Sequence, residues 1–380
     1  MIPYGRQHLD SQDVKSVSNS LKNDLITTGK IVNQFERKLK FFFNSKHAIS
    51  CSSGTAGLHL SLLAIGVKEN DIIVMPAINF IAIYNLCSLL KAKIFLADVD
   101  PNTGQMTPET LMQCIKKNNL KKIKLIVTMY LGGYPENNIN FYKIKKKFDT
   151  ILLEDACHSL GTTYKYKSKD LKIGSCEHSD ISVFSLHPVK TITTGEGGVV
   201  TTNNNEIAKK LFLLRSHGIV RNKNNHWSYD VIYNGLNYRL SDINCALGIS
   251  QLKKIKKFIA FRKKINEFYK KSLFSFFSFP NYNQNNKSAY HLFLVQFQDK
   301  KKSLKEKFIK YLKKNKIIAQ YHYIPIYKFS VYKKNTFKKF KNSEFFFKNT
   351  VSLPIFYNLN YKKQKSIFLK IKLFFKKYSA

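Results

Sequence analysis

Apolar and polar positions alternate in blocks along the first 220 residues, and the blocks switch between strand and helix patterns. Short apolar runs rich in β-branched residues predict strands, whereas apolar residues three or four positions apart predict helices. The expected strands are His47–Ser52, Asp71–Pro76, Lys93–Val99, Leu125–Tyr130, Ile151–Ala156, Ile181–Leu186 and Val199–Thr202. The expected helices are Gly54–Ile65, Asn79–Leu90, Pro108–Lys117, Ile139–Phe148 and Glu206–Ser216.

This rhythm predicts an α/β protein whose large domain has a mostly parallel sheet covered by helices. The run Ile151–Ala156 is almost continuously apolar, as expected for a strand that is covered on both faces. Residues 1–25 have the pattern of an extended arm followed by a helix, with Asp10 or Ser11 as its N-cap. Ligands of such sheets bind at the carboxyl ends of the strands, so the polar residues that follow each strand are the first candidates for a site.

The pattern changes near residue 250 and predicts a smaller C-terminal α+β domain. A long helix is expected from about Ser241 to Lys264, and Asn281–Asn286 is expected to be a loop. The later elements are two strands and two helices, at Tyr290–Phe297, Ile317–Ile324, Ser303–Lys314 and Lys362–Lys376. We therefore expect a large domain over residues 1–250, including the arm, and a small domain over residues 251–380.

The charge of the chain is extreme, since 64 Lys and Arg residues stand against 24 Asp and Glu residues, for a net charge of +40. Such a charge is compatible with nucleic-acid binding. The lysines are scattered, however, and much of the excess lies in helical stretches such as Lys253–Lys264 and Lys300–Lys316. We expect no nucleic-acid partner, and a basic surface that favours an anionic substrate such as a nucleotide.

The six cysteines show neither a CxxC motif nor a disulfide framework, and we expect a reduced, cytoplasmic protein. The start has no signal-peptide pattern, and no apolar run is long enough to insert into a membrane. His158 and His187 have no neighbours at metal-ligand spacing, so we expect no metal.

The segment 181–201 combines a short strand with Ser185, His187, Lys190 and a glycine turn. A lysine held between two strands can form Schiff bases with carbonyl compounds and with pyridoxal phosphate. In a chain this basic, a solvated surface charge is the competing interpretation of Lys190.

Two further segments are suited to phosphate. Ser52–Gly57 closes a strand and opens a helix, where free amide groups and the helix dipole favour an anion. Asn234–Arg239 is a polar turn ahead of a long helix and could donate amides to the same group. Both are also compatible with ordinary helix starts.

Asp155 ends the apolar strand 151–156, and a carboxylate in such a place is costly unless it is paired. A pyridinium nitrogen would pair with it, and so would a helix N-cap or a salt bridge within the protein. Phe80 follows another strand and could stack on a flat ring, or simply pack in the core.

Taken together, these segments resemble the DegT-type sugar aminotransferases, a branch of the fold-type I pyridoxal phosphate enzymes. The resemblance spans almost the whole chain. The segments that carry it are Thr27–Glu36, Ser52–Leu60, Pro76–Ala82, Ala97–Gly104, Leu153–Gly161, Phe184–Gly198, Arg215–Arg221, Leu236–Gly248, His322–Tyr327 and Ser352–Phe356.

The resemblance implies roles for individual residues. Lys190 matches the lysine that forms the Schiff base with pyridoxal 5′-phosphate, Asp155 the partner of its ring nitrogen, and His158 a neighbour of its ring hydroxyl. Phe80 matches the residue that stacks on the ring. The positions that match phosphate ligands are Gly54, Thr55, Ala56 and Ser185, together with Asn237 from the neighbouring subunit of a homodimer. Substrate contacts are expected at Tyr4, Arg239 and Tyr323.

The implied activity is transfer of an amino group from L-glutamate to the C4 ketone of a nucleotide-linked 4-keto-6-deoxyhexose. Four segments, at residues 2–10, 20–30, 187–198 and 215–221, are most similar to transaminases that act on UDP-4-keto-6-deoxy-N-acetyl-L-altrosamine. These enzymes belong to pseudaminic acid synthesis for surface glycans such as lipopolysaccharide or flagellin glycan.

Three departures from the family pattern, at Tyr130, Tyr327 and Tyr357, fall on the substrate side and leave the sugar open. The alternatives are an aminotransferase for another ketosugar, a sugar dehydratase on the same scaffold, and a regulatory or nucleic-acid-binding protein. Retention of Lys190 favours transamination over dehydration.

Overall fold

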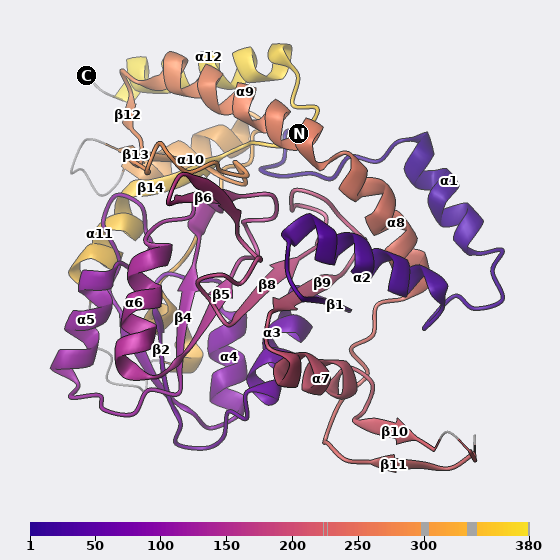
Figure 1. Cartoon of the computed structure of the whole chain (residues 1–380). Helices are drawn as coiled ribbons and strands as arrows, with labels where there is room; N and C mark the ends of the chain where they lie inside the picture. Colours follow the sequence, from indigo (N-terminus) through magenta and orange to yellow (C-terminus); the bar gives the residue numbers. More distant parts are fainter. Residues whose placement is uncertain (223, 226, 298–303, 333–339, 379–380) are drawn as a thin grey trace.

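The computed structural model describes residues 1–222, 224–225, 227–297, 304–332 and 340–378 (Figure 1). Its strands are β1 (His47–Cys51), β2 (Ile72–Pro76), β3 (Lys93–Ala97), β4 (Leu125–Met129), β5 (Ile151–Asp155), β6 (Thr163–Tyr166), β7 (Lys169–Lys172), β8 (Ile181–Ser185), β9 (Gly198–Thr202), β10 (Ile219–Arg221), β11 (Tyr229–Val231), β12 (Phe277–Ser278), β13 (Phe293–Phe297) and β14 (Thr350–Leu353). Its helices are α1 (Ser11–Ser20), α2 (Lys30–Phe43), α3 (Gly54–Ala64), α4 (Ala82–Leu89), α5 (Pro108–Lys117), α6 (Asn138–Phe148), α7 (Asn205–Leu214), α8 (Asp242–Lys253), α9 (Ile255–Leu273), α10 (Leu304–Lys314), α11 (Lys341–Asn349) and α12 (Tyr361–Tyr378).

A seven-stranded sheet forms the centre of the molecule, in the order β1-β9-β8-β5-β4-β2-β3. The neighbours from β8 through β3 pair in parallel, and β9 runs antiparallel to both β8 and β1. The mostly parallel, helix-covered sheet that the sequence predicts is therefore confirmed. Parallel strands place their carboxyl ends at one edge, so the residues that follow β5 and β8 lie close together.

The two faces of the sheet are covered by different helices, because successive residues of a strand point to opposite faces. Ile73, Leu125 and Leu153 pack against α3, α4 and α7. Their neighbours Val74, Ile126 and Leu152 pack against α5 and α6. Burial on both sides explains why β2, β4 and β5 are almost continuously apolar.

The C-terminal part is built on β12, β13 and β14, which form a separate antiparallel sheet beside α9, α10 and α12 (Figure 1). Its core combines aliphatic residues with several aromatic ones, among them Phe277, Phe293, Phe308 and Phe374. The α+β character agrees with the pattern of the sequence, and the boundary at residue 250 stays a prediction.

Asp10 caps α1, as one of the two candidates predicted, by accepting hydrogen bonds from the backbone amides of Gln12 and Asp13. The long helix expected over 241–264 is two helices, however, since α8 ends at Lys253, α9 begins at Ile255, and Lys254 caps both with φ −98° and ψ −4°. The Lys254 ammonium contacts the carboxylates of Asp10 and Asp13 at 2.8 and 2.6 Å, so α1 is tied to this junction.

The strand expected at Ile317–Ile324 is absent, although its β-branched residues have the pattern of one. Ile317 bridges to Ile2 and Gln320 bridges to Ser352, so the segment pairs with two different neighbours and forms no continuous ladder. Pro325 ends it, and residues 320–324 line a cavity instead. The expected helix Ser303–Lys314 is present from Leu304, and its first residue lies outside the described ones.

Several elements have no counterpart in the prediction. They are α2, α11, β12, β14 and the hairpins β6–β7 and β10–β11. Helix α2 was missed although its buried residues recur at helical spacing, at Val32, Phe35, Leu39 and Phe43.

Candidate active site

A cavity of about 660 Å³ lies at the carboxyl ends of β5 and β8. The predicted site residues that line it are Tyr4, Gly54, Thr55, Phe80, Asp155, His158, Ser185, Lys190 and Tyr323. These residues come from the N-terminal arm, from four segments at the edge of the sheet, and from the C-terminal part. The fold therefore brings together groups that are up to 319 positions apart in the sequence.

Lys190 lies in the loop between β8 and β9, where its backbone amide donates a hydrogen bond to the carbonyl of His187 at 2.9 Å. Burial lowers the pKa of its ammonium, and the nearby Cys157 and Asp155 oppose that shift. A lysine with a lowered pKa carries a larger fraction of neutral amine, which is the nucleophilic and basic form.

Asp155 ends β5 and is 4% exposed. Its Oδ1 accepts a hydrogen bond from the amide of Cys157 at 3.3 Å. Burial raises the pKa of the carboxyl, and hydrogen bonding at Cys157 and the charge of Lys190 counteract part of that rise. In the described part of the chain it forms no salt bridge, so a positively charged donor in the cavity would stabilise it.

The preceding residue, Glu154, points away from this cavity and is used by the protein itself. It accepts hydrogen bonds from Tyr130 Oη at 2.6 Å and from Ser182 Oγ at 2.5 Å. The two adjacent carboxylates of β5 therefore differ in role: one is satisfied in the core, and the other faces the cavity.

The N-terminus of α3 forms another wall. Ser53 caps the helix by accepting a hydrogen bond from the amide of Ala56 at 3.0 Å. The amides of Gly54 and Thr55 have no acceptor within the helix and remain for a ligand. A Cβ on Gly54 would lie 2.9 Å from the Ser185 Cβ, so glycine allows the loop and β8 to approach closely.

His158 is fully buried and lies in a cluster with Tyr323 and His291. Its Nδ1 accepts from the amide of Gly132 at 3.3 Å, and its Nε2 is 2.9 Å from Tyr323 Oη. The His291 ring lies 4.2 Å from the His158 ring, between centroids. Burial, followed by the charge of Lys190, lowers the pKa of His158 well below its usual range, so the imidazole is neutral.

The segment after β2 contributes an aromatic and an amide side chain to the cavity, Phe80 and Asn79. Phe80 is 53% exposed, so one face of its ring is open to a ligand. The adjacent Asn79 is 1% exposed, and hydrogen bonding from its side chain helps to lower the pKa of the Asp155 carboxyl. Asn79 therefore supports the carboxylate that faces the cavity.

Three predicted residues do not line this cavity: Ala56, Asn237 and Arg239. The amide of Ala56 is taken by Ser53. Asn237 pairs with Ser216, and the next residue, Tyr238, accepts a hydrogen bond from the amide of Ser52 at 2.9 Å. The contribution of Asn237 from a neighbouring subunit stays a prediction.

The structure also adds residues that were not predicted for the site. Asn79, Cys157, Gln320, Tyr321 and His322 line the cavity. Asn79 and Cys157 directly neighbour predicted site residues, so their place at the strand ends could have indicated them. The residues from 320 to 322 lie in the segment 317–324, for which the sequence pattern predicts a strand.

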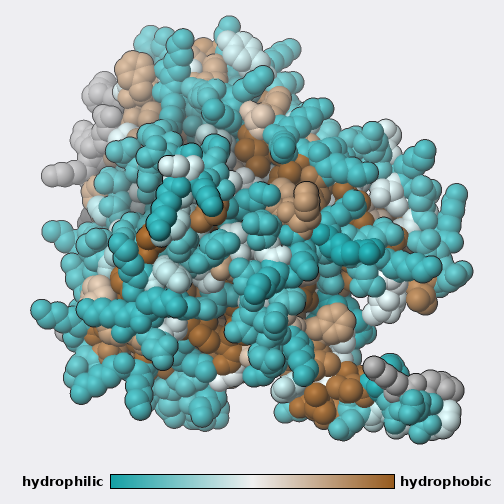
Figure 2. Space-filling model, viewed as in Figure 1, coloured by the Kyte–Doolittle hydropathy of each residue, from teal (hydrophilic) through white to brown (hydrophobic). Residues whose placement is uncertain are grey.

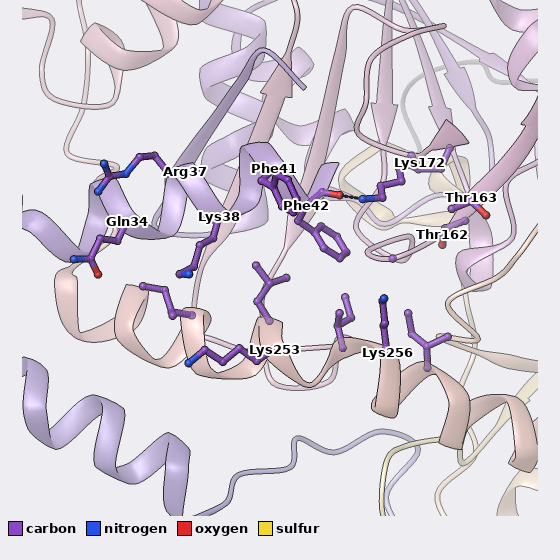
Figure 3. A pocket seen from close by; sticks show the side chains of 16 residues that line it. Gln34, Arg37, Lys38, Phe41, Phe42, Thr162, Thr163, Lys172, Lys253 and Lys256 are labelled. Carbon is purple, nitrogen blue, oxygen red and sulfur yellow. Dashed lines mark hydrogen bonds between the residues drawn. The ribbon is translucent and has the colours of Figure 1, made fainter. Parts of the chain in front are cut away.

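A second cavity, of about 970 Å³, lies between α2, β7 and the junction of α8 with α9 (Figure 3). Lysines surround it, and the Lys172 ammonium donates to the carbonyl of Phe42. Its lining includes neither an acid nor the lysine at 190. The smaller cavity, which combines an amine, a buried carboxylate and free helix amides, is the candidate active site.

The described residues form neither a metal site nor a membrane-spanning helix. Within the described ranges, no three His, Cys, Asp or Glu side chains are grouped so as to hold a metal ion. No helix in the same ranges has the length and apolarity needed to cross a membrane. All six cysteines are free thiols.

Comparison with known proteins places this chain in a family. A model of the DegT/DnrJ/EryC1/StrS aminotransferase family matches residues 7–372. The chain belongs to this family. The resemblance inferred from the sequence motifs is therefore confirmed, and the protein is an aminotransferase by descent.

Two relatives support this assignment over the full length. A UDP-4-amino-4,6-dideoxy-N-acetyl-β-L-altrosamine transaminase of Campylobacter jejuni (strain 81-176) is 37% identical over 370 residues, covering 97% of this chain and 96% of the relative. The structure of Helicobacter pylori PseC, an aminotransferase in the biosynthesis of pseudaminic acid, superposes with a TM-score of 0.89 at 29% identity, covering 99% and 100% of the two chains.

Proposed function

We propose that this protein uses pyridoxal 5′-phosphate to transfer the amino group of L-glutamate to the C4 ketone of a nucleotide-linked 4-keto-6-deoxyhexose. The proposed sugar is UDP-4-keto-6-deoxy-N-acetyl-L-altrosamine, since two Campylobacter jejuni relatives at 37 and 36% identity are transaminases named for the corresponding amino sugar. The observation that carries the proposal is that Lys190, with a lowered pKa, and the buried carboxylate of Asp155 line one cavity.

The donor groups of the cavity fit this cofactor. Gly54, Thr55 and Ser185 would hold its phosphate, and Asp155 would accept from its ring nitrogen. Phe80 is 53% exposed beside them, and the Asn79 side chain lies next to Asp155. A Streptococcus pneumoniae protein of the same fold has been solved in a PLP form. The bound cofactor supplies an electron sink for the carbon that loses a proton.

The protein's own contribution to the reaction is proton transfer and charge stabilisation. Lys190, with a pKa lowered by burial, takes a proton from one carbon and returns it to another as general base and acid. Asp155 remains a carboxylate while it is paired with a protonated ring nitrogen, and so stabilises the charge that develops during the transfer. The walls formed by Phe80, Tyr4 and Tyr323 limit water around the reacting atoms.

The decisive experiment incubates the purified, cofactor-loaded protein with L-glutamate and a set of nucleotide ketosugars, and analyses the products by mass spectrometry. We expect conversion of a 4-ketosugar to its 4-amino derivative, with 2-oxoglutarate formed in equal amount. A product that has lost water and gained no nitrogen would favour the dehydratase. Absence of both products across the set would refute the proposal.

We also propose that the protein is a cytoplasmic homodimer with shared active sites. The β10–β11 hairpin projects from the body of the chain and carries apolar side chains on its surface (Figures 1 and 2). Val220, Val231 and Ile232 are 41, 52 and 48% exposed. A second copy covering such a patch would bury it, and two-fold symmetry would then repeat the contact and create two equivalent active sites. Free thiols and a glutamate donor suit the cytoplasm.

Mixed dimers test the sharing directly. If Asn237 acts on the partner's site, a dimer of one Lys190→Ala chain and one Asn237→Asp chain has one doubly defective site and one intact site. About half of the sites in mixed dimers should then be active, although each parent dimer is inactive. Continued inactivity after verified subunit exchange would show that Asn237 acts within its own chain, and an active Asn237→Asp parent dimer would show that it has no role.

A further inference from the structure

The hydrogen bonds of His158 determine where its proton lies. The amide of Gly132 can only donate, so His158 Nδ1, 3.3 Å away, must be an unprotonated acceptor. The ring is neutral, because burial and the charge of Lys190 hold its pKa well below the usual range. A neutral imidazole keeps one proton, and that proton must therefore be on Nε2.

This assignment fixes the direction of the next hydrogen bond. His158 Nε2 is 2.9 Å from Tyr323 Oη, and it is the ring atom that carries the proton. The imidazole is thus the donor and the tyrosine oxygen is the acceptor. The hydroxyl proton of Tyr323 is not used in this bond, and the described part of the chain contains no other hydrogen-bond partner for that hydroxyl.

The free proton belongs to a side chain that faces the candidate active site. Tyr323 lines the cavity with Lys190 and Asp155, and its ring lies 5.8 Å from that of Phe80. Resting on the proposed function, we propose that Tyr323, oriented by His158, donates a hydrogen bond to an oxygen atom of the ligand in this cavity.

The surroundings support a donor rather than an acceptor. Burial, followed by the negative charge of Asp155, raises the pKa of the Tyr323 hydroxyl well above its usual value, so it keeps its proton. Behind His158, the buried ring of His291 packs at a centroid distance of 4.2 Å and restrains the imidazole. His158 is therefore a positioning residue, and Tyr323 is the residue that contacts the ligand.

Two ligand oxygens have the required chemistry: the ketone oxygen of the sugar and the ring oxygen of the cofactor. Tyr323→Phe removes the donor and keeps the ring, so one variant tests both. In the first measurement, the PLP-loaded protein is titrated calorimetrically with the 4-ketosugar without amino donor, so that no turnover occurs. Loss of a bond to the sugar should weaken binding by up to about tenfold, the range of one neutral hydrogen bond.

In the second measurement, the visible absorbance of the bound cofactor is followed against pH without sugar. A donor withdraws electron density from the ring oxygen, so the lysine nitrogen joined to the cofactor loses its proton more easily. If Tyr323 donates to the cofactor, Tyr323→Phe should raise the midpoint of the pH-dependent absorbance change by about one pH unit. This is the effect of one hydrogen bond to a charged group.

Tyr327→Phe is the matched control. It removes a hydroxyl from the same segment. The family pattern places this position on the substrate side, but the structure does not: the hydroxyl donates to Glu344 at 2.9 Å, and Tyr327 does not line the cavity. A change in either measurement for Tyr323→Phe but not for Tyr327→Phe supports the proposal and identifies the acceptor. No change in both measurements would overturn it.

A third measurement needs no ligand and separates this inference from the proposed function. In protein labelled with ¹⁵N-histidine, the signals lost in His158→Gln identify His158. We expect the neutral form protonated on Nε2. Protonation on Nδ1, or a charged ring at neutral pH, would contradict the assignment even if the transaminase activity is present. If no ketosugar reacts and this tautomer is found, the proposed function fails while the orientation of Tyr323 stands.

Discussion

The replacement of Asp155 by asparagine tests the electrostatic core of the proposed mechanism. Asparagine is nearly isosteric, and its Oδ1 can still accept the hydrogen bond that the amide of Cys157 donates at 3.3 Å. The change therefore removes the negative charge with little effect on packing. Since Asp155 is 4% exposed, water cannot replace that charge at the ring nitrogen.

The expected loss follows from the energy of a buried hydrogen bond to a charged group. Such a bond contributes about 1.5–3 kcal/mol, and removing one partner of a buried charge pair costs about 3–5 kcal/mol. Because asparagine preserves the shape of the side chain, we expect Asp155→Asn to lose about 2–3 kcal/mol of transition-state stabilisation. At 1.36 kcal/mol per factor of ten, the proton-transfer step should slow by roughly 30- to 160-fold.

The half-reaction with glutamate, followed by stopped-flow absorbance of the bound cofactor, isolates this step from sugar binding. Glu154→Gln is the matched control, since it removes the adjacent buried carboxylate of β5, which bonds Tyr130 and Ser182 instead of facing the cavity. It should lower the thermal stability and leave the half-reaction rate nearly unchanged. An Asp155→Asn rate within about twofold of the wild type, or an equal loss in Glu154→Gln, would refute the reasoning.

Two further predictions concern lysines. Lys190→Ala should abolish turnover and the visible absorbance of the lysine-bound cofactor, as checked by spectroscopy and product analysis, and retained activity would exclude Lys190 as the reacting amine. Burial lowers the pKa of Lys305 to about 7, so its charged form destabilises the fold below that pH and the cost fades as the pH rises towards the unfolded value near 10.5. Denaturant unfolding should therefore show the stability of the wild type rising relative to Lys305→Met between about pH 7 and 10, and a constant difference would contradict the low pKa.

The site residues on the central sheet could be predicted from the sequence because local strand and helix patterns determine their positions. Apolar runs place β5 and β8, and parallel pairing puts Asp155 and Ser185 at one edge. The helix start after β1 adds Gly54 and Thr55 to the same edge. Each of these positions follows from a strand pattern and the residue that ends it, so no knowledge of distant contacts is needed.

Helix α2 and the break at Lys254 show where local patterns fail. Helix α2 carries Phe35 and Phe43 at zero exposure against the sheet, but its N-cap is Gly29, which makes no side-chain capping bond. Two buried amides at its start are instead satisfied by Asp242, which accepts from Gly29 and Ile31 at 2.8 and 2.9 Å. The start of this helix is thus specified by a residue more than 200 positions away.

The C-terminal wall of the active site depends on contacts of the same long-range kind. Arg262 of α9 is 2% exposed and donates from Nη1 to the carbonyls of Ile355 and His291, at 3.0 and 3.3 Å. Because a buried guanidinium is costly without such acceptors, these bonds hold the start of β13 and the end of β14 against one helix. His291 is thereby placed behind His158, and His158 in turn holds Tyr323. No periodicity encodes this series of contacts, so Tyr323 could be named from its motif while its hydrogen bonding could be found only in the folded chain.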